Sequence, residues 1–127
     1  MVTYYPSYES VIEAHERIVK ASGGTAGILS SSNLHYILDT VKDIRKGSEF
    51  DALVSKAAYI LYNIITLHPF VDGNKRTAFE ITKAFLQLNS WGFEPREDEA
   101  FNTLISVAKG ESDIKGVQVW IRKHLKQ

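Results

Sequence analysis

The sequence contains no cysteine. This absence excludes disulfide bonds, thiolate catalysis and cysteine-ligated metals, and it is typical of proteins in a reducing cytosol. The chain also lacks a net charge, because its 15 basic residues balance its 15 acidic ones. Its overall charge therefore does not favour binding to nucleic acid or to a membrane. The chain also lacks an apolar signal segment at its start and any run of about 18 uncharged apolar residues. We therefore expect a cytoplasmic protein that binds neither nucleic acid nor membrane.

What the sequence does contain is apolar residues at helical spacing along nearly all of its 127 residues. The length predicts a single domain, 1–127. Capping residues divide the pattern, for example Ser7 before the first helix and Gly23 after it. The expected helices span about 8–22, 31 or 32 to 47, 50–67, 74–91, 98–108, and 113 or 116 to 126.

The fold class predicted from this pattern is an all-α bundle of about six helices. The helix at 50–67 is apolar around most of its circumference and should lie at the centre. On the later helices we expect inward positions that include Leu88, Phe101 and Leu125. Pro69 disfavours the helical conformation at His68, so the chain should turn there.

That turn begins the stretch HPFVDGNKRTAFE, residues 68–80, which raises an electrostatic question. Lys75 and Arg76 fall in the first turn of the next helix, where cations oppose the helix dipole by roughly 0.3–1 kcal/mol each. Free N–H groups after a glycine such as Gly73 form a natural anion site. A bound polyphosphate would explain the two cations, since local rules are expected to fail at functional sites.

The neighbouring residues supply matching chemistry. His68 titrates near neutrality and is a candidate general base. Asp72 is a hard oxygen ligand suited to Mg²⁺ that also binds substrate phosphates, and Asn74 can donate to a phosphate oxygen. Together these are the parts that phosphoryl transfer uses.

Each residue also has a purely structural interpretation. Asp72 would serve equally as a helix cap, Gly73 as a source of positive φ, and His68 as a histidine at a helix end. Lys75 and Arg76 would serve as a solvated face. Only their combination in one short loop favours a functional site.

HPFVDGNKR resembles the signature of the Fic/Doc family, H-P-F-x-[D/E]-G-N-x-R. The stretches HERI…GG…G, KAAYILYNI and FLQLNSWGF are also similar to Doc-type chains, so the resemblance covers about residues 8–125. The matching positions of the signature are His68, Pro69, Phe70, Asp72, Gly73, Asn74 and Arg76.

Two positions indicate a branch within that family. Adenylyl-transferring Fic proteins typically have glycine where this chain has Lys75, and a second arginine where it has Phe79. Doc-like toxins share both departures, and they phosphorylate a threonine of elongation factor Tu. The resemblance therefore implies a reversed triphosphate of ATP, presented by its γ-phosphoryl group. Adenylyl or other nucleotidyl transfer is the first alternative, and a non-catalytic helical binding module is the second.

The resemblance also implies a role for each motif residue. His68 would deprotonate the target hydroxyl, and Asp72 would hold Mg²⁺. Asn74, Lys75 and Arg76 would bind phosphates and offset transition-state charge. The backbone at Gly73 would contribute to the anion nest, and Phe70 would pack under the loop.

Regulation is a further expectation from the resemblance. Some Fic proteins carry an inhibitory [S/T]-x-x-x-E-[G/N] helix, but the nearest match, residues 90–95 (SWGFEP), contains glycine and proline and should not form a helix. We therefore expect a toxin that is restrained by a separate antitoxin protein. The loop at 23–32 is either a flap that clamps a target segment or a plain surface connector.

Overall fold

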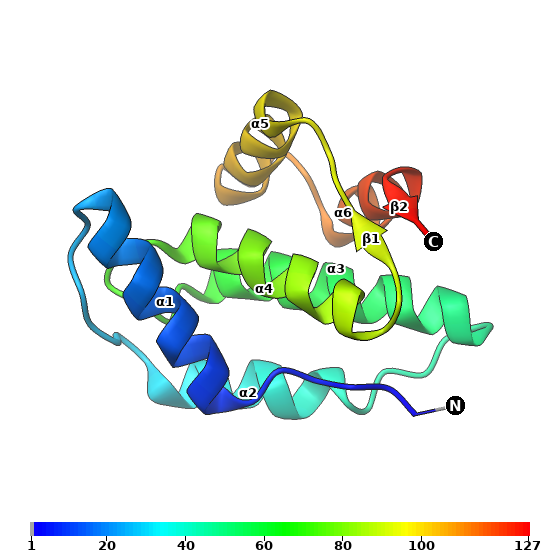
Figure 1. Cartoon of the computed structure of the whole chain (residues 1–127), viewed down its shortest axis with the longest axis horizontal. Coiled ribbons are helices and arrows are strands. Elements are labelled where there is room, and N and C mark those ends of the chain that lie inside the picture. Colours follow the sequence, from blue (N-terminus) through cyan, green and yellow to red (C-terminus); the bar gives the residue numbers. More distant parts are fainter. Residues whose placement is uncertain (1) are drawn as a thin grey trace.

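A computed structural model describes residues 2–127, and it confirms the all-α class. Six helices surround a shared core, and one small two-stranded sheet completes the described part of the chain (Figure 1). The elements are α1 (Tyr8–Ser22), α2 (Ser31–Val41), α3 (Glu49–Leu67), α4 (Asn74–Leu88), β1 (Gly92–Phe93), α5 (Glu97–Ala108), α6 (Ile114–Lys123) and β2 (Leu125–Lys126).

The helix α3 is the centre of the bundle, as its composition predicts. It begins at a capping box, in which the Ser48 hydroxyl accepts from the Asp51 N–H and the Asp51 carboxylate accepts from the Ser48 N–H. Its sides pack against α2, α4, α5 and α6. By length and composition α3 is also apolar enough to cross a membrane, but most of its residues are buried inside the domain. This burial explains its apolar composition.

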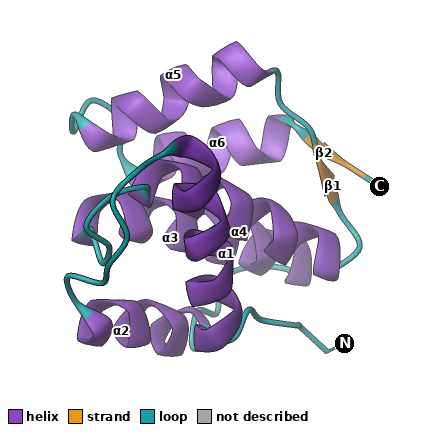
Figure 2. Cartoon of the chain, turned by 60° about the vertical axis from the view of Figure 1, so that its left-hand side comes forward, coloured by secondary structure: helices purple, strands orange, loops and turns teal. Residues whose placement is uncertain are grey.

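The connection between α3 and α4 lies at one end of the bundle. The two helices run side by side, and α1 packs across α4 (Figure 1). The loop after α1 lies beside the α3–α4 connection (Figure 2), and an antiparallel bridge between Ile28 and Phe70 joins the two segments. The HPFVDGNKR stretch is thus braced by a second segment from the first third of the chain.

The start and end of α2 differ from the prediction. Its cap is Ser30, whose hydroxyl accepts from the Asn33 N–H at 3.0 Å, rather than Ser31 or Ser32. The helix ends at Val41 instead of continuing toward Gly47. Tighter turns follow, and the Arg45 guanidinium donates to the carbonyls of Lys42 and Ile44, so the side chain satisfies groups that a longer helix would have used.

The fourth and sixth helices also end earlier in the sequence than predicted. The helix α4 ends at Leu88 because the Asn89 amide donates to the Phe85 carbonyl and bonds both backbone groups of Tyr4. The helix α6 ends at Lys123, and Leu125–Lys126 pair antiparallel with Gly92–Phe93. No local pattern in the sequence predicts these two-residue strands.

Two residues expected in the core are instead on the surface. Leu88 is 53% exposed and Phe101 is 60% exposed. At the end of α4, Leu86 is fully buried in place of Leu88. On α5 the buried residues are Ala100, Leu104 and Val107, so the buried face of the helix is rotated away from Phe101.

Candidate active site

His68 stands at the carboxyl end of α3 and is exposed to solvent. Its backbone is left-handed (φ 50°, ψ 58°), and its N–H donates to the Ile64 carbonyl at 3.2 Å. A non-glycine residue in this conformation stores strain, which is common at functional sites. Because the side chain makes no hydrogen bond with the described residues, the imidazole is available to a substrate hydroxyl.

Behind His68, the loop is held by residues that face the core. Phe70 is fully buried, which confirms that it packs under the loop. The Asn74 carboxamide forms two bonds with Phe70: its Oδ1 accepts from the Phe70 N–H at 3.0 Å, and its Nδ2 donates to the Phe70 carbonyl at 2.9 Å. The predicted contact between Asn74 and phosphate stays a prediction. In this structure the buried carboxamide closes the loop.

His15 of α1 is a second residue that supports the loop, and its role was not predicted from the sequence. Its ring stacks on Phe70 with centroids 3.8 Å apart, and its Nε2 lies 2.7 Å from the Asp72 carbonyl. The side chain is nearly fully buried. The HERI stretch contains this histidine, but nothing in the local sequence indicates a partner 57 residues away.

Asp72 is exposed, yet its carboxylate is fixed. Oδ2 accepts from the Thr25 N–H at 3.1 Å, and Oδ1 accepts from the Gly73 N–H at 2.8 Å. These donors, Thr25 first and Gly73 second, hold the pKa of the Asp72 carboxyl below its ordinary value of 3.8. Asp72 does not cap α4, because the N-cap position is Gly73 and no side chain bonds to the start of the helix.

The amino end of α4 offers free donors. Gly73 has φ 77°, and a Cβ there would approach Val19 to 3.0 Å, so both conformation and space favour glycine. The N–H of Gly73 is already bonded to Asp72, but the next three N–H groups, from Asn74 to Arg76, have no acceptor among residues 2–127. Such a group of donors at a helix start binds anions.

Lys75 and Arg76 flank these donors. Both side chains are exposed, and neither forms an ion pair with a described residue. Phe79 lies one turn later, at the position of the second arginine in the adenylyl-transferring pattern. Its side chain is half-buried, and its ring centroid is 5.9 Å from that of the buried Phe93. Unpaired positive charge on this side of α4 is therefore confined to the first turn.

The residues at 24–30 form a wall beside the loop. The Leu29 and Ser30 N–H groups donate to the Pro69 carbonyl, and the Val71 N–H donates to the Gly27 carbonyl. Backbone hydrogen bonds therefore join this segment to the motif, which a plain surface connector does not require. Its predicted role as a flap that clamps a target stays a prediction.

The carboxylate of Asp72 fits a metal shared with a nucleotide. Among residues 2–127 no group of three or more histidine, aspartate or glutamate side chains could hold a metal by itself. Mg²⁺ commonly uses one or two carboxylates together with substrate phosphates and water. Asp72 has unused lone pairs and stands beside the donors of α4, so it suits a metal that arrives with phosphate.

The segment 90–95 is not helical, as predicted. Ser90 has φ 72°, and Gly92–Phe93 form β1. The described residues therefore contain no inhibitory helix at this place.

The geometry and the sequence pattern agree with a comparison to known families. The family model described as Fic/DOC matches residues 5–86, which include the whole α3–α4 loop. The chain belongs to the Fic/DOC family. Members of this family are generally transferases that act on proteins. A search among curated proteins finds no match.

Proposed function

We propose that this Fic/DOC protein is a Doc-like kinase, which transfers the γ-phosphoryl group of ATP to a hydroxyl of a target protein. One arrangement supports the proposal above all. His68 and the fixed Asp72 carboxylate flank a helix start that has free N–H groups and two exposed cations. These groups match the needs of phosphoryl transfer, which relies on positioning and charge stabilisation.

In the proposed reaction the acceptor hydroxyl lies between His68 and the terminal phosphate. His68 takes the hydroxyl proton, the hydroxyl oxygen forms a bond to the γ-phosphorus, and the bond from that phosphorus to the bridging oxygen of ADP breaks. The N–H groups at the start of α4, with Lys75 and Arg76, receive the phosphate oxygens. Mg²⁺, bound by Asp72, would neutralise charge on the phosphates.

The choice of γ-phosphoryl over nucleotidyl transfer rests on two positions. Lys75 adds a cation at the first turn of α4, and Phe79 replaces a cation one turn later. Lys83, the next cation along this side of the helix, is paired with Glu94 at 3.3 Å. A terminal phosphate carries more charge than an internal one, so this distribution favours placing the γ-phosphate at the helix start. Nucleotidyl transfer remains the alternative within the same fold.

The resemblance to Doc-like toxins supports the proposed target and the proposed restraint, and the loop before α2 adds a proposed target-binding segment. The target is elongation factor Tu, modified on a threonine, and the consequence is inhibition of translation in the cytoplasm. A separate antitoxin protein restrains the enzyme. The loop at 23–32 is the flap that receives the target segment, and the side chains of Ile28 and Leu29 in this loop, like that of Val71 in the motif, are exposed.

Expression of the chain alone in a bacterium tests this function. Growth and protein synthesis should stop, and elongation factor Tu purified from the arrested cells should carry a phosphate. The His68→Ala variant is the matched control, because an exposed loop residue contributes little to the core, and its transfer rate should fall by about 10²–10⁴-fold. Arrest by a well-folded His68→Ala protein at the wild-type rate would remove His68 from the mechanism.

A further inference from the structure

The end of the bundle opposite the candidate active site contains a pocket of about 940 Å³. Its walls are the N-terminal segment, the connection between α2 and α3, the beginning of α3 and the end of α4. Figure 1 shows these parts together on the right, whereas the α3–α4 connection lies on the left. Lys56, which lines the pocket, precedes His68 by about 18 Å along α3, from the rise of an α-helix. The pocket is therefore separate from the candidate active site.

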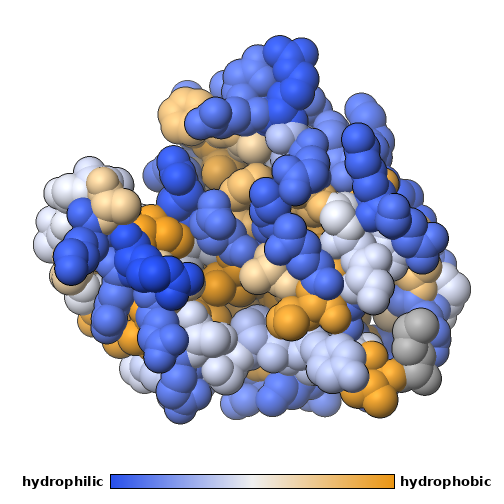
Figure 3. All heavy atoms as spheres, in the orientation of Figure 1, coloured by the Kyte–Doolittle hydropathy of each residue, from blue (hydrophilic) through white to orange (hydrophobic). Residues whose placement is uncertain are grey.

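Aromatic and aliphatic side chains form a large part of the pocket lining. They are Tyr4, Tyr5, Ile44, Phe50, Leu53, Leu88 and Trp91. The Phe50 and Trp91 rings contact each other, with centroids 5.0 Å apart. In Figure 3 apolar atoms are visible at the lower right, where Figure 1 places the N-terminal segment and the end of α4. Such a lining suits a ligand with an apolar or aromatic body.

The charged side chains in the lining are mainly positive. Three cations line the pocket, Arg45, Lys46 and Lys56, against one side-chain carboxylate, that of Glu49. The Arg45 guanidinium donates to two backbone carbonyls. None of the three cations forms an ion pair with residues 2–127. This charge distribution favours a ligand that carries an anion.

Lys56 differs from the other two cations because it is buried, with only 7% of its surface exposed. Its ammonium donates to the Tyr5 hydroxyl at 2.8 Å and lies 5.3 Å from the centroid of the same ring. A lysine ammonium has three N–H donors, and Tyr5 supplies the one hydrogen-bond acceptor that residues 2–127 offer to it. A buried charge is costly unless it is both paired and hydrogen-bonded.

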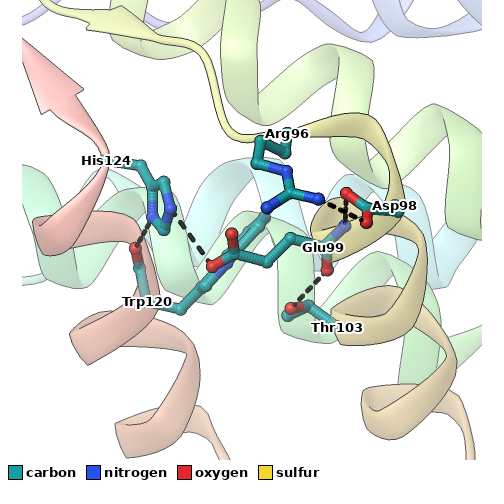
Figure 4. A network of polar contacts seen from close by, with 6 residues as sticks. All are labelled: Arg96, Asp98, Glu99, Thr103, Trp120 and His124. Carbon is teal, nitrogen blue, oxygen red and sulfur yellow. Dashed lines mark hydrogen bonds and ion pairs between the residues drawn. The ribbon is translucent and has the colours of Figure 1, made fainter.

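A group of charged residues near the start of α5 and the end of α6 provides a comparison. Figure 4 shows Arg96 bonded to Asp98 at 2.9 Å, and His124 directed toward Glu99 with Nε2 and Oε1 3.2 Å apart. Both basic side chains are more exposed than Lys56, yet each has a carboxylate partner. Lys56 has none within residues 2–127. A carboxylate on a ligand would supply the missing anion.

We propose that this pocket binds a small carboxylic acid with an aromatic or apolar body, in its ionised form. The remaining N–H groups of Lys56 donate to the two carboxylate oxygens, and the exposed Lys46 attracts the anion at the rim. The body of the ligand packs against Phe50 and Trp91. This ligand is distinct from the nucleotide and the target protein, so the proposal does not depend on the proposed function.

An NMR titration that follows the two tryptophan indole N–H signals tests the pocket. The probes are phenylacetate and phenylacetamide, which have nearly the same shape but differ in charge. Phenylacetate should shift the signal of Trp91, which lines the pocket, and leave that of Trp120, which does not. The wild-type protein should bind phenylacetate roughly 10- to 150-fold more tightly than phenylacetamide, the range for a hydrogen bond to a charged group.

Three substitutions of lysine by methionine locate the anion. Lys56→Met keeps a long side chain without the ammonium, and it should lose the preference for phenylacetate. Lys46→Met, at an exposed position, should weaken phenylacetate binding by only about 1.5- to 5-fold. Lys115→Met is the matched control, because Lys115 is an exposed lysine of α6 that does not line the pocket. It should leave both affinities unchanged.

Two results with the wild-type protein would overturn the proposal, and neither depends on the folding of a variant. One is the absence of any phenylacetate-dependent shift of the Trp91 signal. The other is equal binding of phenylacetate and phenylacetamide. An unchanged preference for phenylacetate in a folded Lys56→Met protein would also overturn it, since the anion would then lie elsewhere.

Discussion

Replacement of Asn74 by alanine separates a structural role from a ligand-binding role. The Asn74 side chain is buried, and both ends of its carboxamide bond to the backbone of Phe70. In Asn74→Ala the Phe70 N–H and carbonyl would lose these partners in a buried place. A stranded buried polar group costs about 1–3 kcal/mol, so with two such groups the free energy of unfolding should fall by roughly 2–6 kcal/mol. That is a large share of the usual stability of a domain, about 5–15 kcal/mol.

Denaturant unfolding measures this change, and Asn63→Ala is a suitable control. The Asn63 amide donates to the Tyr59 carbonyl at 2.9 Å within α3, where that carbonyl also accepts from the helix backbone. Its loss should therefore lower stability by less than about 1 kcal/mol. If Asn74→Ala unfolded like the wild type but no longer bound nucleotide, the structural reasoning would be refuted and Asn74 would be a phosphate ligand.

Three further substitutions test the charges and the close contacts of the site. Lys75→Glu should abolish the binding of ATP with Mg²⁺, measured by calorimetric titration, and should leave the melting temperature equal or slightly higher, because an anion is favourable at a helix start. A lower melting temperature with intact ATP binding would show that Lys75 has a structural role. In Gly24→Ala the new Cβ would lie 2.7 Å from Asp72 Oδ2, so the transfer rate should fall while the melting temperature changes little. Gly116→Ala in α6 is the control and should leave the transfer rate unchanged. A wild-type transfer rate in Gly24→Ala would show that the position of the Asp72 carboxylate is unimportant. The pKa of Asp72 is lowered in the folded protein, so the ionised carboxylate stabilises the fold above pH 3.8, and this contribution is lost as the pH falls below that value. The difference in stability between the wild type and Asp72→Asn should therefore shrink as the pH is lowered from about 6 to about 3. A difference that stays constant over this range would contradict the prediction.

The helices could be predicted from the sequence because local signals determine them. Ser7 and Gly23 mark the two ends of α1, and their cap geometry agrees with the prediction. The apolar pattern of α3 correctly indicates its central place. One error occurs where a side chain at the end of a helix bonds to a distant segment, as when Asn89 bonds to Tyr4, 85 residues away. Local propensity does not contain that information.

The candidate site could be predicted in its residue types but not in its construction. The conflict between two cations and the dipole of α4 identifies the loop from sequence alone. The braces come from elsewhere: His15 and Thr25 reach Asp72 from α1 and the following loop. Phe101 shows the same limit, because its apolar character predicts a core position although the side chain is 60% exposed.

A transfer reaction with two differently labelled preparations of ATP shows which part of the nucleotide the protein transfers. Purified protein is incubated with elongation factor Tu and Mg²⁺, with the label on either the γ- or the α-phosphate. We predict that the target acquires only the γ label, and that the Lys75→Glu protein transfers neither. Retention of the α label on the target would rule out γ-phosphoryl transfer and would assign this protein to nucleotidyl transfer.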